Sequence, residues 1–214
     1  VSLVAADERI ARYRHPLPTL PGTAHARNVK RYVMVVAGVI REGLSVSLTR
    51  FKQVDTLDPA IEDAYRRICA VDACMQEATA PGRTLGDVFA ACQEAYQRFG
   101  FVPDEWHNHH QGGSTGFAGR TCKGAPGEIF PCLDAAWADE FRKGAGLVVP
   151  VATAFAWNPS APGVKSEDTF LLHEDGRKEI ISCTPGLPRV DLEAVLGRPT
   201  AVLKSGIGWT SVDS

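Results

Sequence analysis

The stretch His107-Asn-His-His-Gln-Gly-Gly-Ser-Thr-Gly-Phe117 carries the strongest signal in the sequence. Three histidines stand directly before a pair of glycines, and glycine lets the backbone approach another group closely because it has no Cβ. Imidazole is the side chain best suited to proton transfer near neutral pH. The other interpretation is a turn whose imidazoles bond only to backbone and water. The stretch therefore indicates a candidate site at His107, His109 and His110.

Two further parts of the chain carry candidate polar groups. One is Ala156-Trp-Asn-Pro159, followed by Gly163-Val-Lys-Ser-Glu-Asp-Thr169, and the other is Ser47-Leu-Thr-Arg50. Asn158 stands before a proline, which is also a common turn opening. Glu167 has a lysine two residues earlier, which is also typical of a hydrated strand end with a weak ion pair. From the residue types alone both interpretations stay open.

The first half of the chain predicts a hairpin and two helices. Arg31 to Ile40 is β-branched and apolar, and Gly43 to Phe51 alternates, which predicts a β-hairpin with one buried face. Apolar residues three and four apart predict a helix from Asp58 to Thr79, with Asp58-Pro59 as N-cap and first-turn proline. A Thr and an Asp three residues apart predict a capping box for a second helix over 84–99.

The second half predicts mostly strands. Val102 to Phe117, the apolar run Gly146 to Trp157, and Glu167 to Leu172 have strand character. Asp175-Gly176 then predicts a tight turn into a strand from Lys178 to Ser182. An α+β fold follows, with an antiparallel sheet and helices segregated to one face.

The remaining segments bear on domain organisation. Residues 122–143 are rich in glycine, proline and small residues and are predicted to be a surface insertion with a short helix over 133–141. The tail beyond Pro185 is weakly patterned. The chain opens at Val1 and runs directly into a polar segment with helical character. We therefore expect a single domain over 1–214 that is the C-terminal part of a longer protein.

Composition narrows the classes of partner and compartment. The 214 residues are 44% hydrophobic and 22% charged, which suits one globular domain with a sizeable core. A net charge of −2 gives no reason to expect nucleic acid or an anionic membrane surface as partner. No apolar run suggests a membrane span and no secretory signal is visible, so we expect a cytoplasmic protein. Six scattered cysteines without a CxxC pair indicate reduced thiols.

In their order, the three segments resemble the landmarks of the creatinase, prolidase and aminopeptidase P family. The resemblance spans about Ile10 to Ser182 and implies the pita-bread fold, a curved antiparallel sheet covered by helices on one face. It also implies a separate N-terminal domain that helps close the active site, usually across a homodimer. Family members with metal hold two ions through two aspartates, a histidine and two glutamates.

Carried over by position, the family's ligands are mostly lost. The first aspartate falls on Val36 and the second on Ser47. The histidine of the glycine turn falls on His110 and is kept, the glutamate before the proline falls on Asn158, and the last glutamate is kept as Glu167.

The family's second catalytic histidine falls on Phe117. A pair of divalent cations needs several anionic oxygens to offset the repulsion between the metals. We therefore expect neither a metal nor another cofactor, with a single weakly held metal on His110, Glu167 and a neighbouring histidine as the alternative that geometry must decide.

The resemblance to the metal-free relatives creatinase and ectoine hydrolase implies metal-independent hydrolysis of a C–N bond in a small molecule or short peptide. Glu167 would orient the attacking water or bind a cationic group of the substrate, and His110 or His109 would be the general base. Asn158 with Arg120 would stabilise the developing oxyanion, and Arg50 or Arg120 would bind a substrate carboxylate unless they are merely solvated. The substrate-binding candidates are Asn158, Arg120, His107 and Arg50.

Two alternatives from other classes remain. One is a non-catalytic module, a pseudo-peptidase that uses the inherited pocket to hold a peptide or metabolite or to build a dimer. The other is a conventional metal-dependent Xaa-Pro peptidase, which would require two ions per chain.

Overall fold

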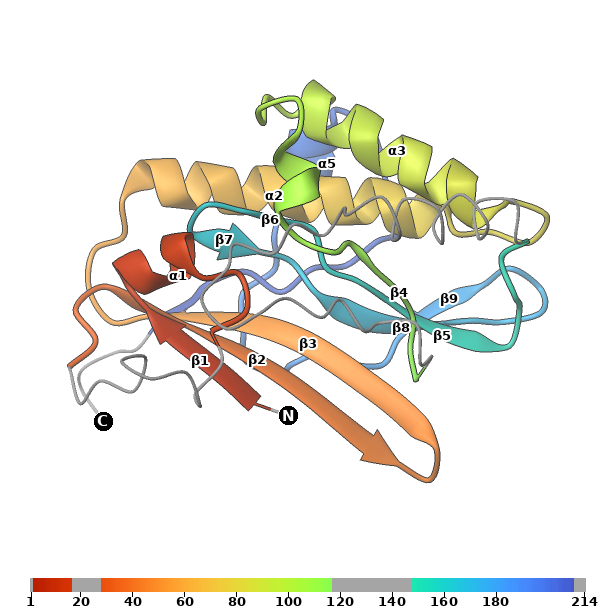
Figure 1. Ribbon diagram of the computed structural model, residues 1–214, viewed down its shortest axis with the longest axis horizontal. Coiled ribbons are helices and arrows are strands. Elements are labelled where there is room, and N and C mark those ends of the chain that lie inside the picture. Colours follow the sequence, from red (N-terminus) through yellow and green to blue (C-terminus); the bar gives the residue numbers. More distant parts are fainter. Residues whose placement is uncertain (1, 17–27, 117–147, 210–214) are drawn as a thin grey trace.

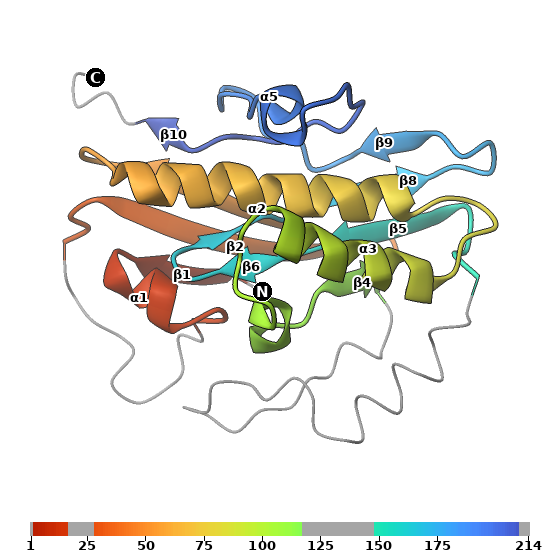
Figure 2. The same cartoon turned by 90° about the horizontal axis from the view of Figure 1, so that it is seen from above.

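The computed structural model of the chain describes residues 2–16, 28–116 and 148–209. The predicted insertion 122–143, together with Phe117 and Arg120, lies outside these ranges. The described strands form two four-stranded sheets, in the orders β1-β2-β3-β10 and β4-β5-β8-β9, and a short β6-β7 ribbon. Figures 1 and 2 show helices α2 and α3 running along the same side of these strands.

The first sheet is built on the predicted hairpin, which is confirmed. Strands β2 (Tyr32–Arg41) and β3 (Leu44–Gln53) pair antiparallel along their whole length. Their turn places Gly43 at a φ of 83°, a conformation that glycine adopts without steric cost. Strand β1 (Ser2–Ala6) adds antiparallel to β2, and β10 (Gly208–Trp209) adds parallel to β3.

The N-terminal segment differs from its prediction. The polar opening was expected to be helical, but it begins with β1, and only a five-residue helix, α1 (Glu8–Arg12), follows. Leu3 and Ala5 alternate inward and are buried. The sheet therefore buries a short alternating segment whose own pattern is weak.

Helix α2 (Pro59–Ala78) confirms the long predicted helix. The Asp58 side chain accepts a hydrogen bond of 2.9 Å from the backbone N–H of Ala60, and the proline occupies the first turn, where its missing N–H is tolerated. Most of the helix from Tyr65 to Gln76 is buried. Phe51 of β3 packs edge-on against Tyr65, with 5.3 Å between ring centroids, which fixes the helix over the hairpin.

Helix α3 (Leu85–Arg98) begins at the predicted capping box. The Thr84 hydroxyl accepts from the backbone N–H of Asp87 at 3.1 Å, and the Asp87 carboxylate accepts from the backbone N–H of Thr84 at 2.8 Å. Two orphan amides at the helix start are thereby satisfied.

The second sheet contains the predicted late strands. They are β5 (Thr153–Trp157), β8 (Asp168–Leu172) and β9 (Lys178–Ile180), with β4 (Gly112–Ser114) at the other edge. All of these neighbours pair antiparallel. The expected strand character of 102–117 is only partly right, because Glu105–Asn108 forms a 3₁₀ helix, η1.

Two short elements complete the described chain. Strands β6 (Ser160–Ala161) and β7 (Val164–Lys165) form a tight ribbon, and helix α5 (Leu192–Leu196) follows β9. The weakly patterned tail is therefore partly ordered by packing against α2. In the described ranges, no helix combines the length and apolar character needed to cross a membrane.

Candidate functional site

The histidine-bearing loop is fixed by a buried glutamine. The Gln111 side-chain amide donates to the carbonyls of Trp106 at 2.9 Å and His109 at 2.7 Å. Its carbonyl oxygen accepts from the hydroxyl of Tyr96 on α3 at 3.3 Å. Because both ends of one side chain are used, the loop is held to the helix and to itself.

Gly112 lets this loop approach β5 closely. It has a φ of 90°, and a Cβ at this position would lie 2.1 Å from the carbonyl oxygen of Ala156. Only glycine fits here without moving the backbone. The first glycine of the Gly-Gly pair is thus explained by a close contact between two strands.

Three imidazoles meet beside this contact, two from the loop and one from the N-terminal segment. The Nε2 atom of His15 lies 3.3 Å from the Nε2 atom of His109 and 3.3 Å from that of His110. The rings stack at centroid distances of 4.4 to 4.9 Å. We call His15, His109 and His110 the histidine cluster.

Two rings of the histidine cluster, those of His15 and His109, are held in the neutral form. Burial, together with the positive charge of Lys165, lowers the pKa of His15 to about 3. Burial, with His110 and Lys165 as further causes, lowers the pKa of His109 well below its usual value. At neutral pH these two rings therefore carry lone pairs and no net charge.

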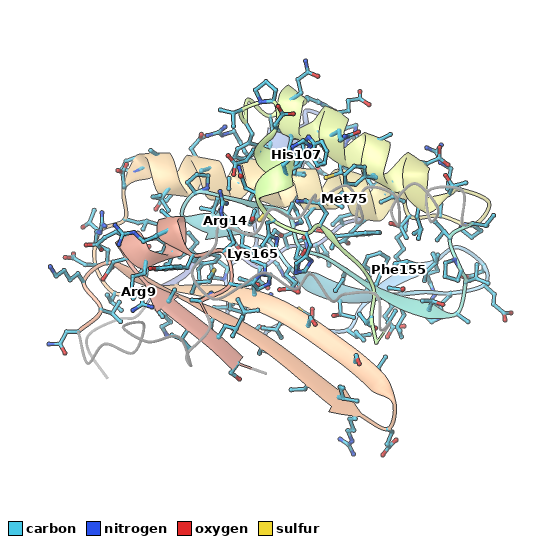
Figure 3. All side chains as sticks on the ribbon, in the orientation of Figure 1. Arg9, Arg14, Met75, His107, Phe155 and Lys165 are labelled. Atoms are coloured by element: carbon cyan, nitrogen blue, oxygen red, sulfur yellow. The ribbon has the colours of Figure 1, made fainter. Side chains whose placement is uncertain are left out.

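Glu167 lies in the interior next to a lysine. It is 4% exposed, and its Oε2 atom accepts a hydrogen bond of 2.7 Å from the hydroxyl of Thr49. The ammonium of Lys165, itself 2% exposed, lies 3.4 Å from the same oxygen. A hydrated strand end is therefore the wrong interpretation of this pair. Figure 3 shows Lys165 near the middle of the molecule, and its charge acts on both His15 and His109.

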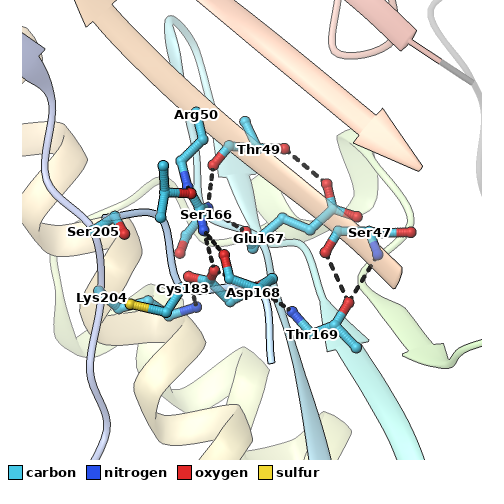
Figure 4. Close-up of polar contacts among 12 residues, drawn as sticks. Ser47, Thr49, Arg50, Ser166, Glu167, Asp168, Thr169, Cys183, Lys204 and Ser205 are labelled. Carbon is cyan, nitrogen blue, oxygen red and sulfur yellow. Dashed lines mark hydrogen bonds and ion pairs between the residues drawn. The ribbon is translucent and has the colours of Figure 1, made fainter. Parts of the chain in front are cut away.

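Arg50 is used within the protein. Its guanidinium donates to the Asp168 carboxylate and to the Ser182 carbonyl, each at 2.6 Å, and to the Thr184 hydroxyl at 2.8 Å. It also donates to the backbone carbonyl of Glu167 at 3.2 Å. Figure 4 shows these contacts between β3 and the start of β8. Arg50 thus fixes the backbone that presents Glu167.

A second buried cation supports the same strand. Lys204 is 1% exposed and forms ion pairs with Asp72 of α2 and, at 3.3 Å, with Asp168. Burial alone would raise the pKa of Asp168, but Lys204 and then Arg50 outweigh it and lower that pKa. Asp72 also accepts a hydrogen bond of 2.6 Å from the Ser166 hydroxyl. This ion network therefore locks residues 166–168 to the helix.

Asn158 lies against the backbone of the histidine-bearing loop, and His107 lies against Trp106. The Asn158 side chain is buried, and no hydrogen-bond partner for its Oδ1 atom lies among the described residues. Its backbone N–H donates to the carbonyl of Gln111 at 3.1 Å, which places it close behind the loop. His107 is half-buried, and its ring meets Trp106 edge-on at a centroid distance of 3.5 Å. Arg120 lies outside the described residues.

The side chains at the resemblance's ligand positions do not fit a pair of metal ions. Val36 has no donor atom and pairs across the hairpin with Thr49. The backbone of Ser47 is bound on both sides by the Thr169 hydroxyl, at 2.8 Å each. The Oε2 atom of Glu167 already contacts a hydroxyl and an ammonium. With one carboxylate among these residues, bridging of two divalent ions is not supported.

Known proteins were compared with the chain by sequence and by structure. No protein-family model and no curated protein matches the sequence. A prolidase from Thermococcus sibiricus superposes with a TM-score of 0.60 at 18% identity, over 86% of this chain and 45% of that one. The X-Pro aminopeptidase from Thermotoga maritima gives 0.59 at 18% identity, over 86% and 47%. The chain has the fold of the pita-bread prolidases.

A third similar structure is not named as an enzyme. The N-terminal domain of the FACT complex subunit SPT16 from Cicer arietinum (chickpea) superposes with a TM-score of 0.54 at 12% identity, over 91% of this chain and 44% of that one. This chain spans less than half the length of all three structures. The expected α+β class is confirmed by the mixed content and the antiparallel pairing.

Sequence reasoning missed two members of the site. His15 lies 94 residues from His109, and no spacing rule connects them. Lys165 was noted only as a surface partner of Glu167, because burial is not visible in a five-residue polar stretch. Arg14 and Glu105, which form a buried ion pair next to the histidine cluster, were also missed, because no sequence pattern connects them.

Proposed function

We propose that the chain hydrolyses a C–N bond in a small substrate or short peptide without a pair of metal ions. The observation that carries this proposal is the meeting of three imidazoles, of which those of His15 and His109 are uncharged, with a buried lysine–glutamate pair. The fold is shared with a prolidase and an X-Pro aminopeptidase, whose names describe C–N hydrolysis. That likeness supports the reaction class.

The proposed mechanism uses an imidazole as the base. His110 takes a proton from water, and the hydroxide adds to the carbon of the C–N bond. The neighbouring His15 at 3.3 Å shares that proton and returns it to the departing nitrogen as the bond breaks. His109 is the other candidate base from the loop, and its burial keeps it neutral.

The charged groups stabilise what develops on the substrate. Lys165 supplies a fixed positive charge near the imidazoles, which can stabilise developing negative charge as a metal ion does in metal-dependent hydrolases. Glu167 holds that ammonium at 3.4 Å and orients the water. Asn158 and Arg120 complete the proposed oxyanion contacts. Arg50 is proposed to be a positioning residue, since its guanidinium is bound to β8 and its neighbours.

A substrate screen on chelator-treated protein tests the proposal. Xaa-Pro dipeptides and small amides and amidines are the first compounds, with release of the amine as readout. His110→Ala should lower kcat by about 10² to 10⁴, the usual contribution of a general base. His173→Ala is the matched control, because this histidine pairs with Glu179 at 3.0 Å on β9's turn. Full activity of His110→Ala would overturn the mechanism.

A second candidate function is binding without turnover. It is favoured by the burial of His109 and Asn158, each 2% exposed, and by the likeness to a domain of a complex subunit. Stoichiometric binding of a peptide or metabolite with no product after long incubation would support it. The homodimer and the cytoplasmic location implied by the sequence remain predictions, and sedimentation tests the first.

A further inference from the structure

We propose that the histidine cluster is a binding site for one divalent transition-metal ion of the class that imidazole prefers, such as Zn²⁺. His15, His109 and His110 each offer a ring nitrogen, and these three atoms all lie within 4.8 Å of one another. They come from two segments far apart in sequence, so the convergence is a property of the fold. The cluster shares only His110 with the ligand positions of the resemblance.

The spacing of the nitrogens suits a tetrahedral ion. With zinc–nitrogen bonds of about 2.0–2.1 Å and tetrahedral angles, two ligand nitrogens lie about 3.3–3.4 Å apart. Both contacts of the His15 Nε2 atom measure 3.3 Å. The ligand atoms of His109 and His110 lie within 4.8 Å of each other and would have to move closer around the ion.

Hydrogen bonding alone satisfies this arrangement poorly. A neutral imidazole Nε2 atom carries either one proton or one lone pair, yet that of His15 faces two others at the same distance. The Nδ1 atom of His109 is buried and has no hydrogen-bond partner among the described residues. Placing the proton of that ring on Nδ1, which leaves the Nε2 lone pair to an ion, therefore breaks no hydrogen bond from Nδ1 to any described residue.

The donor atoms that remain available at the cluster determine which metals it can bind. Lys165 is offset by Glu167, and Arg14 by Glu105, so two ion pairs without net charge surround the imidazoles. The cluster therefore offers imidazole nitrogens to an ion, while the carboxylates of Glu167 and Glu105 are already engaged with cations. Zinc, nickel and copper accept imidazole ligands, whereas manganese and magnesium prefer oxygen. The histidine cluster should therefore bind zinc, nickel or copper in preference to manganese or magnesium.

This inference goes beyond the proposed function and can fail separately from it. An ion on the Nε2 atoms takes up the nitrogen that the proposed base would use, so we expect hydrolysis from the metal-free chain and none from the zinc-loaded chain. Binding through Nε2 also moves the proton of His110 to Nδ1, which now accepts a long bond of 3.3 Å from the backbone N–H of Gly112. The amide of Gly112 therefore reports on binding.

Titration of the chelator-treated full chain with ZnCl₂ alone tests the proposal. Calorimetry and elemental analysis after gel filtration should give one ion per chain, and CoCl₂ should give the absorption bands of a tetrahedral cobalt site. Absence of zinc binding, or two ions per chain, would overturn it. The result needs no substrate, so it stands whether or not hydrolysis is found.

Variants locate the ion. His15→Ala should weaken zinc binding more than about 100-fold, beyond the 10–100-fold typical of outer-shell partners. His15 is half-buried whereas His109 is buried, so His15→Ala is expected to disturb folding less than His109→Ala, and a thermal melt without metal checks it. His173→Ala should bind zinc as the unmodified chain does. Unchanged affinity in His15→Ala would place the ion elsewhere and refute the assignment.

Discussion

Replacing Lys204 by methionine should destabilise the fold strongly. The side chain is 1% exposed and lies between the carboxylates of Asp72 and Asp168. Asp168 retains Arg50 at 2.6 Å, but among the described residues Asp72 retains only neutral donors, the Ser166 hydroxyl and the Gln76 amide. Removing one partner of a buried ion pair costs about 3–5 kcal/mol, because the remaining charge is uncompensated.

Urea unfolding at pH 7 measures this loss. With an m-value of about 3 kcal/mol/M, the urea concentration at the unfolding midpoint should fall by about 1–1.7 M. Adding Asp72→Asn to Lys204→Met should recover about 2 kcal/mol or more, because the orphaned charge is then absent. Lys52→Met, on an exposed position of β3, is the control and should change stability by less than about 0.5 kcal/mol. A loss below about 1 kcal/mol in Lys204→Met would refute the ion network as the lock on residues 166–168.

Three other outcomes are expected. The pKa of Asp7, which burial alone would raise, is lowered by three backbone N–H donors of residues 30–32; Asp7→Asn should cost about 2 kcal/mol at pH 7. Because the pKa of Asp7 is lower in the folded chain than its unfolded value of about 3.9, its stabilising effect is complete above that value and is lost as the pH falls through the folded pKa. The difference in unfolding free energy between the unmodified chain and Asp7→Asn should therefore disappear in acid. Gly112→Ala should lower the free energy of unfolding by about 3 kcal/mol or more, through backbone strain and the clash with Ala156. Gly113→Ala should lower it by less, because the space at its Cβ is open. Equal losses of the two variants in urea unfolding would contradict the close contact. Lys165→Met should raise zinc affinity by calorimetry, because a positive charge beside the cluster is removed, and weaker binding would contradict this electrostatic account.

Local rules predicted the elements that their own residues specify. The capping box at Thr84 and the proline after Asp58 define helix starts through contacts within four residues. The hairpin of β2 and β3 follows from alternation along both strands. Such features depend on neighbours in sequence, so they can be read without the structure.

The site depended on long-range packing and was predicted only in part. His109 and His110 were identified from their glycine neighbours, but His15 joins them through a contact across 94 residues. The burial of Glu167 was left open, since a polar stretch gives no sign that Thr49 of β3 and the buried Lys165 lie against it. Arg50 was expected to face substrate or solvent, whereas the fold uses it to hold β8.

Metal selectivity tests the central claim most directly. The chelator-treated chain is dialysed first against MnCl₂ and separately against ZnCl₂, and the bound metal is then measured by elemental analysis. The account predicts no retained manganese, because the carboxylates for a two-metal centre are absent, and one zinc ion per chain on the imidazoles. Two manganese ions per chain would contradict it and would restore a two-metal peptidase.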